Sequence, residues 1–519
     1  MGVGRKFPDD AAPMIVHSSG SATAKPSFGP LILRGASWKL TSQIVVQLGR
    51  ICFVLVLARL LTPGDFGLVA MSLVITGFVI AFADLGLGAA LVQRHTIDEQ
   101  DRSTVFWTGL GAGMLLTLAG IALSGPLAAF YGEAAVQGLA AALSLSFFVT
   151  ALGATQRALL VREMNFRTLE LATIAGVYVG GIVGVACASA GWGAWSLVVQ
   201  QLTNVSVSTA VIWLTSPWRP HLNWSSASLR SLGGFGGNVL GTRLTYAAQE
   251  SALPLIVGRS LGSGSLGIFT IAYTIVLQPL SRLAIPIGEV LFPAFSRLQH
   301  DLERLADMWL RGLRVLASFC IPAMAGLVVV APDLVPLLLG DQWDDAVPVL
   351  QILAWVGLLQ ALGAWNGAIL LGLGKARVLF RATTAILVTY VVAFLIGVQW
   401  GTIGTAIAYA IAATGAECLL LLLATDALGI SFFRPLRMVG GVAQATLVMV
   451  VATVALRALL VEADTPASVL LVVVIAAGIA TYAALLKWRA PEVLAEIRSV
   501  LERRRREAAP ARVAGNSEA

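Results

Sequence analysis

The sequence predicts an all-α polytopic membrane protein with about fourteen transmembrane helices, arranged as two similar six-helix lobes followed by two further helices. Two observations predict the helices. Of the 519 residues, 57% are hydrophobic and only 12% are charged, and the mean hydropathy is +0.83, whereas soluble domains carry a charged fraction of roughly 25%. The chain also contains fourteen apolar runs near the length of about 20 residues that crosses a bilayer as a helix. A third observation, an internal repeat, predicts the two lobes.

The elements follow one another through short connections. The N-terminal residues hold Pro, Ser, Gly and both signs of charge but no apolar core, which predicts disorder and excludes a signal peptide. The predicted organisation is a disordered cytoplasmic tail (1–33), an N-lobe of helices 1 to 6 (34–215), a cytoplasmic linker (216–230), a C-lobe of helices 7 to 12 (231–428), helices 13 and 14 (429–489) and a basic cytoplasmic tail (490–519).

Lys and Arg predict the orientation of the chain, because cytoplasmic loops carry the excess of these residues. With the N-terminus inside, most basic residues fall in inner loops and tails, and the outer loops hold only Arg59, Arg259 and Arg457. This asymmetry predicts an even number of helices with both termini cytoplasmic. The basic C-terminal tail fits either a helix on the anionic membrane surface or a solvated tail.

An internal repeat joins the two predicted lobes. The outer turn "LARLLTPGDFGLVAMSLVI" (57–75) returns two hundred positions later as "VGRSLGSGSLGIFTIAYTI" (257–275). The identities are Arg59 and Arg259, Leu61 and Leu261, Gly64 and Gly264, Gly67 and Gly267, and Ile75 and Ile275. A shift of six helices keeps the direction through the membrane, so the two copies relate by an axis along the membrane normal. Carriers that expose one central site to each side in turn are commonly built this way.

Ionisable residues inside the predicted membrane helices are confined to a few helices. Burying such a charge is costly, so these side chains are expected to face an internal cavity or a partner. Helices 1, 2, 7 and 8 carry Arg50, Asp84, Arg243, Glu250, Arg282 and Glu289, and Glu417 in helix 12 is the one clear exception. The repeat and the charges select the same four helices, which predicts a cavity between the lobes with Arg50 facing Glu250.

The cavity is predicted to bind an anion with several oxygens, because arginine offers planar bidentate contacts to phosphate. The expected substrate-binding residues are Arg50, Arg243, Arg282, Gln47, Asn238, Tyr246, Gln249 and Tyr273, and the expected ion-coupling or gating residues are Asp84, Glu250 and Glu289. Other interpretations stay open. The arginines could form structural ion pairs, the amides could hold helices together, and Asp84 and Glu289 could simply reach the headgroups. Arg59 and Arg259 are expected to be interface anchors.

Several function classes find no support. The stretch "LGLGKAR" (371–377) lacks the hydroxyl residue of a nucleotide-binding loop, and no folded basic domain suits nucleic acid. The four cysteines and four histidines stand apart, so no metal or cofactor is expected. An integral-membrane glycan transferase or ligase remains a competing class, for which the outer segment 331–347 offers Asp333, Asp341, Asp344 and Asp345.

Residues 33–94 contain "LRGASWKLTSQIV" and "LARLLTPGDFGLVAMSLVITGFVIAFADLGLGAALVQR", and "AILLGLGKARVLFR" follows at 368–381. These segments resemble bacterial polysaccharide exporters of the Wzx type, in the polysaccharide transporter family of the multidrug/oligosaccharidyl-lipid/polysaccharide exporter superfamily. The similarity is greatest to the branch that includes the colanic-acid exporter, and it extends over roughly 31–490.

The resemblance implies a V-shaped pair of bundles and a flippase rather than an enzyme. Its substrate would be an undecaprenyl-pyrophosphate-linked oligosaccharide, moved across the bacterial inner membrane for exopolysaccharide, capsule or O-antigen synthesis. Arg50, Arg243 and Arg282 would hold the pyrophosphate, and a proton or sodium gradient would drive the cycle. Membrane lipids and polysaccharide polymerase and co-polymerase proteins would be the partners. A multidrug antiporter or a peptidoglycan-precursor flippase of the same superfamily is the alternative; the former favours an acidic, aromatic cavity.

Overall fold

The computed structural model describes residues 28–83, 88, 91–92, 94, 96–226, 229, 236–489 and 492, and these are almost entirely helical. Side chains are described for these residues except 28–41, 77–83, 236–246, 278–294 and 296–297. The expected tail therefore lies outside the described residues up to position 27, and its last six residues belong to the first helix, which begins at Phe28. The expected C-terminal tail lies outside them except for Glu492.

Six helices make up the N-terminal bundle. They are α1 (Phe28–Leu60), α2 (Pro63–Ala83), α4 (Glu99–Tyr131), α5 (Ala134–Arg162), α6 (Phe166–Ser189) and α7 (Trp195–Thr215). Helices α4 to α7 pack side by side, and α1 lies along α6. The sequence dictates this packing at Gly176, Gly180 and Gly184, because a side chain at any of the three would overlap Gln200, Asn204 or Ser208 of α7. These glycines stand four residues apart in "GVYVGGIVG", a spacing typical of close helix packing, and the contacts agree with it.

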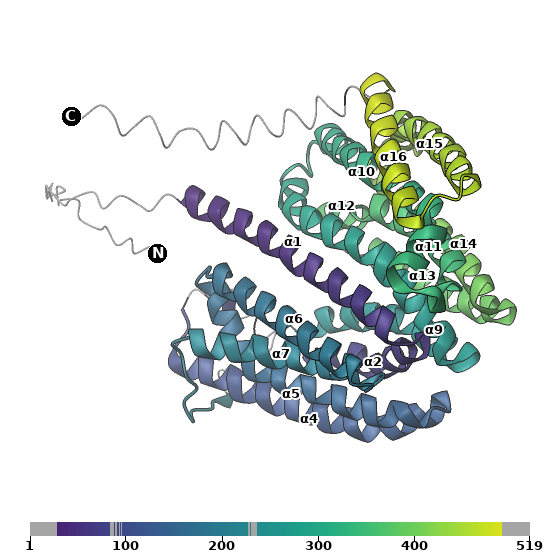
Figure 1. Cartoon of the computed structure of the whole chain (residues 1–519). Coiled ribbons are helices and arrows are strands. Elements are labelled where there is room, and N and C mark those ends of the chain that lie inside the picture. Colours follow the sequence, from purple (N-terminus) through teal and green to yellow (C-terminus); the bar gives the residue numbers. More distant parts are fainter. Residues whose placement is uncertain are drawn as a thin grey trace, which may run out of the picture.

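The C-terminal bundle contains the longer helices of the chain. They are α9 (Gly236–Arg297), α10 (Leu302–Leu339), η1 (Asp341–Trp343), α11 (Ala346–Gly363), α12 (Asn366–Gly372), α13 (Ala376–Gly397), η2 (Val398–Trp400) and α14 (Gly401–Leu428). Two further helices, α15 (Phe433–Glu462) and α16 (Ala467–Arg489), pack on α10 at the outside of this bundle. In Figure 1 the two bundles converge where α2 meets α9 and diverge toward the beginning of α1, which runs between them.

The outer surface of the bundles is apolar, as contact with lipid requires. Large side chains stand more than half exposed on several helices, among them Leu115, Ile182, Leu447 and Val472. Eleven helical stretches within the described residues are long and apolar enough to cross a membrane. One of these, Ala376–Leu428, contains both α13 and α14, and another, Ala247–Leu277, passes through a break in α9 at Gly262. The count of fourteen crossings stays a prediction.

Candidate functional site

The first copy of the repeated turn is built by local sequence. Thr62 precedes α2, and its backbone N–H and its hydroxyl both donate to the Asp65 carboxylate, at 2.9 and 2.8 Å. The Asp65 N–H donates in return to the Thr62 hydroxyl at 3.3 Å. This reciprocal cap, with Pro63 at the first helical position, ends α1 and starts α2 within two residues.

The second copy of the turn breaks its helix at the equivalent residue. Gly262 interrupts α9 with φ +81° and ψ −179°, a conformation open essentially to glycine alone. Position 262 corresponds to Thr62 in the repeat, and Ser263 corresponds to Pro63. The two copies thus share the place of the turn as well as residues, although one uses a side-chain cap and the other a glycine.

The two copies pack against each other as a self-complementary pair. A Cβ atom on Gly67 would overlap the backbone carbonyl of Ser263, and a Cβ atom on Gly267 would overlap the carbonyl of Pro63. Pro63 and Ser263 occupy equivalent positions in the two copies. The contact of Gly67 with position 263 therefore has the same form as the contact of Gly267 with position 63. Such reciprocity is the mark of a two-fold axis between the copies. The repeat found in the sequence is therefore also a structural symmetry of the chain.

A second set of contacts ties α1 to the end of α10. The guanidinium of Arg59 donates to the carbonyl of Leu338 at 2.9 Å and to that of Leu337. In the other direction, the Gln342 amide donates to the carbonyls of Ala58 at 2.7 Å and Leu61 at 3.0 Å. The last carbonyls of a helix lack partners within it, so each helix end here is capped by side chains from the other bundle.

Trp343 completes this junction between the bundles. Its indole N–H donates to the Ala58 carbonyl at 2.8 Å, and its ring meets Phe66 edge to face with centroids 5.4 Å apart. Around it lies one continuous core in which equivalent residues of the repeat, Leu57 and Val257, are both fully buried. We call these contacts, from the glycine crossing to Trp343, the bundle junction. It closes the space between the bundles at the end that the charge distribution predicts to be periplasmic.

The predicted cavity residues that the structure describes lie on the helices that meet at the junction. Gln47 and Arg50 are half-buried on α1, Gln249 is half-buried on α9, and Glu250 and Tyr273 are exposed on α9. The side chains of Asn238, Arg243, Tyr246, Arg282 and Glu289, all on α9, lie outside the described residues, and so does Asp84. The pairing of Arg50 with Glu250 stays a prediction.

The predicted anchoring role of Arg59 differs from what its contacts indicate. Both arginines of the repeat are exposed, and the guanidinium of Arg59 binds helix carbonyls of the other bundle. Sequence reasoning also missed Gln342 and Trp343, which it counted only as part of an acidic outer segment. The signal available in the sequence was a glutamine and a tryptophan standing between aspartates, at Gln342 and Trp343.

The aspartates of that outer segment are dispersed over different contacts. Asp333 on α10 accepts two hydrogen bonds from Arg457 on α15, at 2.5 and 3.1 Å. Within the searched part of the chain, no three His, Cys, Asp or Glu side chains come together where they could hold a metal ion. Asp341, Asp344 and Asp345 are exposed in and after η1.

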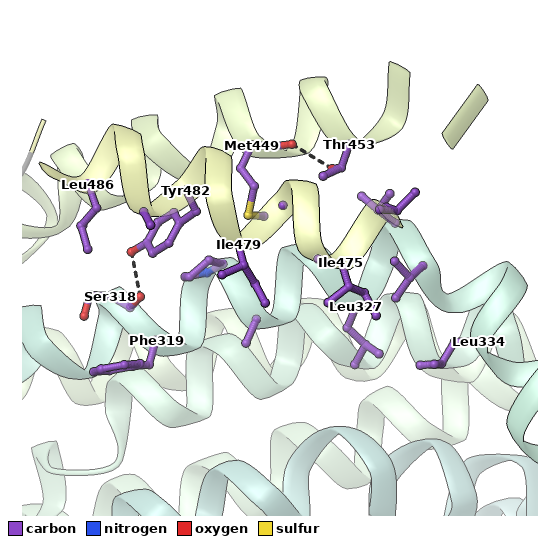
Figure 2. A pocket seen from close by; sticks show the side chains of 18 residues that line it. Ser318, Phe319, Leu327, Leu334, Met449, Thr453, Ile475, Ile479, Tyr482 and Leu486 are labelled. Atoms are coloured by element: carbon purple, nitrogen blue, oxygen red, sulfur yellow. Dashed lines mark hydrogen bonds between the residues drawn. The ribbon is translucent and has the colours of Figure 1, made fainter. Parts of the chain in front are cut away.

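An apolar groove of about 620 Å³ runs between α10, α15 and α16. Figure 2 shows Phe319, Leu327, Ile475 and Ile479 along it, with the Tyr482 hydroxyl donating to the Ser318 carbonyl at 2.7 Å. Its position on the outer side of α10 separates it from the bundle junction, and its lining suits hydrocarbon.

Two solved structures share this fold. The structure titled "Lipid II flippase MurJ, inward closed conformation" matches with a TM-score of 0.71 at 13% identity, over 89% of this chain and 100% of that one. An inward-facing multidrug resistance MATE family transporter of the MOP superfamily matches with a TM-score of 0.59 at 16% identity, over 75% of this chain and 94% of that one. The fold class predicted from the sequence is confirmed.

Sequence comparison then gives the family. A model of the family described as "Polysaccharide biosynthesis protein" matches residues 56–348, and the chain belongs to this family. It is 29% identical to the lipopolysaccharide biosynthesis protein WzxC of Escherichia coli K12, over 73% of this chain and 77% of that one. It is 27% identical to the succinoglycan biosynthesis transport protein ExoT of Rhizobium meliloti, over 67% of this chain and 71% of that one. The resemblance identified from the first hairpin is confirmed.

Proposed function

We propose that the protein is a flippase that carries a polyprenyl-pyrophosphate-linked oligosaccharide across the bacterial inner membrane, for the synthesis of a surface polysaccharide. Membership of the polysaccharide biosynthesis family supports a glycan as the cargo, and the relative ExoT is named a biosynthesis transport protein. The fold it shares with the lipid II flippase MurJ supports translocation of a lipid-linked cargo rather than catalysis on it.

The bundle junction is the observation that carries this proposal. Two pseudo-equivalent bundles meet at one end through a two-fold contact of Gly67 and Gly267, and polar residues continue along α1 and α9 away from it. A carrier needs such a joint, because the bundles must separate there when the opposite end closes. With the predicted orientation, the bundle junction holds the bundles together at the periplasmic end, and the cargo would be loaded from the cytoplasmic end.

We assign the pyrophosphate to Arg50, Arg243 and Arg282, with the glycan along Gln47, Asn238, Tyr246, Gln249 and Tyr273. The polyprenyl tail stays in lipid. A gradient of H⁺ or Na⁺ drives net transport in one direction, and Asp84, Glu250 and Glu289 are the groups that couple the ion to transport. The polymerase and co-polymerase proteins of polysaccharide synthesis are the expected downstream partners, and both termini are placed in the cytoplasm.

Substitution of the arginines tests the assignment. We expect Arg50→Ala and Arg243→Ala to abolish polymer export at normal protein levels in the membrane, because each removes a guanidinium from the anion site. Arg377→Ala, an exposed arginine near the start of α13, is the matched control and should export normally. Export that persists in both cavity variants would refute the pyrophosphate assignment.

Depletion of the protein tests the cargo. A lipid-linked oligosaccharide is expected to accumulate on the inner leaflet, where it can be extracted and identified by mass spectrometry. Accumulation of a peptidoglycan precursor instead would favour the alternative flippase activity.

A further inference from the structure

Glu417 is a half-buried acidic residue to which the transport cycle described above gives no role. It lies on α14, deep within the candidate membrane-spanning stretch Ala376–Leu428. Its Oε2 atom is buried and has no hydrogen-bond partner within the described part of the chain. A buried polar group without a partner is rare in folded proteins, and an unpaired buried carboxylate is especially unfavourable.

The fold makes room for this carboxylate. It lies against Gly363 of α11, where a Cβ atom would overlap Oε2. A glycine at this point therefore lets α11 approach the acid closely. Among the described side chains no ion pair forms with this carboxylate, which indicates a use other than structural pairing.

Tyrosines and one amide surround the acid. Tyr409 lies two turns earlier on α14, and Tyr390 faces it from α13 with ring centroids 5.2 Å apart. The Gln360 amide of α11 donates to the Tyr409 hydroxyl at 3.1 Å. Both tyrosines are buried and interact electrostatically with Glu417. The hydroxyls therefore form a polar layer beside an otherwise apolar bundle core.

This layer leads toward the space between the bundles. Tyr273 of α9 interacts electrostatically with Tyr390 and Tyr409, and its own side chain is 38% exposed. Tyr273 in turn interacts with Glu250, which is exposed on the same helix. Tyr273, Tyr390 and Tyr409 thus lie within electrostatic range of one another, between the exposed Glu250 and the half-buried Glu417.

The groups that face Glu417 from each packed helix can be named. Among the described side chains they are Tyr409 on α14 itself, Tyr390 on α13, Tyr273 on α9 and the neutral Gln360 on α11. Helices α12 and η2 contain no titratable side chain. No charged group of α10 interacts with Glu417 among the described residues. A proton is favoured over a metal ion, since Glu417 belongs to no group of three or more His, Cys, Asp or Glu side chains in the part of the chain searched.

We propose that Glu417 is a proton-binding site in the C-terminal bundle, connected to the space between the bundles through Tyr409, Tyr390 and Tyr273. The carboxylate takes one proton from water at the Glu250 end and becomes a neutral carboxyl group, and it releases that proton when the route exposes it again. The neutral form suits the tight packing of α11 against α14, while the ionised form requires water. The coupling of this event to transport rests on the proposed flippase function.

Infrared spectroscopy of the purified full-length protein in liposomes tests the site without any cargo. We expect a carboxyl C=O band that disappears with rising pH in the wild type and is lost in Glu417→Gln, which keeps the shape of the side chain. Glu462→Gln, at the exposed end of α15, is the matched control and should keep the band. A band that survives in Glu417→Gln, or one that responds to Na⁺ at constant pH, would overturn the proposal.

Transport in the same liposomes separates this proposal from the proposed function. An imposed pH gradient should accelerate flipping of a lipid-linked oligosaccharide by the wild type and by Glu462→Gln, and this acceleration should be lost in Glu417→Gln. If the wild type moves no oligosaccharide lipid at all, the flippase assignment fails while the spectroscopic result stands. If Glu417→Gln keeps the full acceleration, the coupling role of the site is refuted.

Discussion

Gly67 and Gly267 lie back to back where the two bundles meet. A Cβ atom on Gly267 would stand 3.1 Å from the backbone nitrogen of Gly67 and would overlap the carbonyl of Pro63. The same overlap recurs between Gly67 and Ser263 on the other side of the pseudo-two-fold axis. At this crossing the bundles meet through bare backbone, so during a transport cycle the side-chain contacts to be released are those elsewhere in the bundle junction, at Arg59 and Trp343.

A disulfide across this joint should arrest the cycle. A Cβ atom on Gly64 would lie 3.9 Å from the Ser263 hydroxyl oxygen, so the two side chains would be neighbours, and a disulfide needs Cβ atoms about 3.5 to 4.5 Å apart. We expect the double variant Gly64→Cys/Ser263→Cys to cross-link under oxidation and to lose polymer export, which reductant restores. Each single variant serves as control and should export under both conditions. Export by the fully cross-linked protein would show that the joint does not open.

The two equivalent arginines of the repeat should behave differently. Arg59→Ala leaves the Leu337 and Leu338 carbonyls without their donor, and a hydrogen bond to a charged group contributes about 1.5 to 3 kcal/mol. We therefore expect the closed junction to be at least about tenfold less populated, since 1.4 kcal/mol is a factor of ten. Labelling of Ser263→Cys by a membrane-impermeant maleimide should become correspondingly faster. The exposed Arg259 supplies the control, and Arg259→Ala should leave the labelling rate unchanged. Equal rates in both variants would contradict the capping role.

Periodicity and repetition in the sequence predict the fold well. Apolar runs predict the helices because lipid demands internal backbone hydrogen bonding, and the shared register of the two hairpins predicts two lobes related by an axis along the membrane normal. The four-residue spacing of the glycines of α6 is typical of close helix packing. In each case the pattern can be found in the sequence without knowing which segments meet in space.

Contacts between distant segments escape this reasoning. Arg59 resembles a membrane-interface anchor because the carbonyls it binds belong to α10, some 280 residues away. From the sequence, Trp343 is only part of an acidic loop, because no neighbouring residue indicates that its indole N–H donates to the carbonyl of Ala58. Glu417 stands out as a charge in an apolar helix, but its glycine and tyrosine neighbours come from other helices and only folding brings them together.

The predicted orientation of the chain can be tested at two loops. A reporter fused after Gly340 is expected to be periplasmic and one after Lys375 cytoplasmic, because a membrane crossing through α11 and α12 separates them. Paired alkaline phosphatase and green fluorescent protein fusions report the two sides with opposite signals. Reversed signals at both positions would place the bundle junction on the cytoplasmic side and invert the direction of the proposed cycle.

Packing of α6 against α7 should limit the stability of the N-terminal bundle. A Cβ atom on Gly180 would come within 2.7 Å of the Gln200 carbonyl and 3.0 Å of Asn204, and backbone cannot yield as a flexible side chain does. Overpacking of this kind costs about 1 to 3 kcal/mol for added methylene groups. We expect Gly180→Val to lower the melting temperature of the detergent-purified protein. Gly111→Val on α4 adds the same atoms where nothing lies within 4 Å, so it should melt close to the wild type. If both variants melt alike, the contact between Gly180 and α7 does not limit the stability of the bundle.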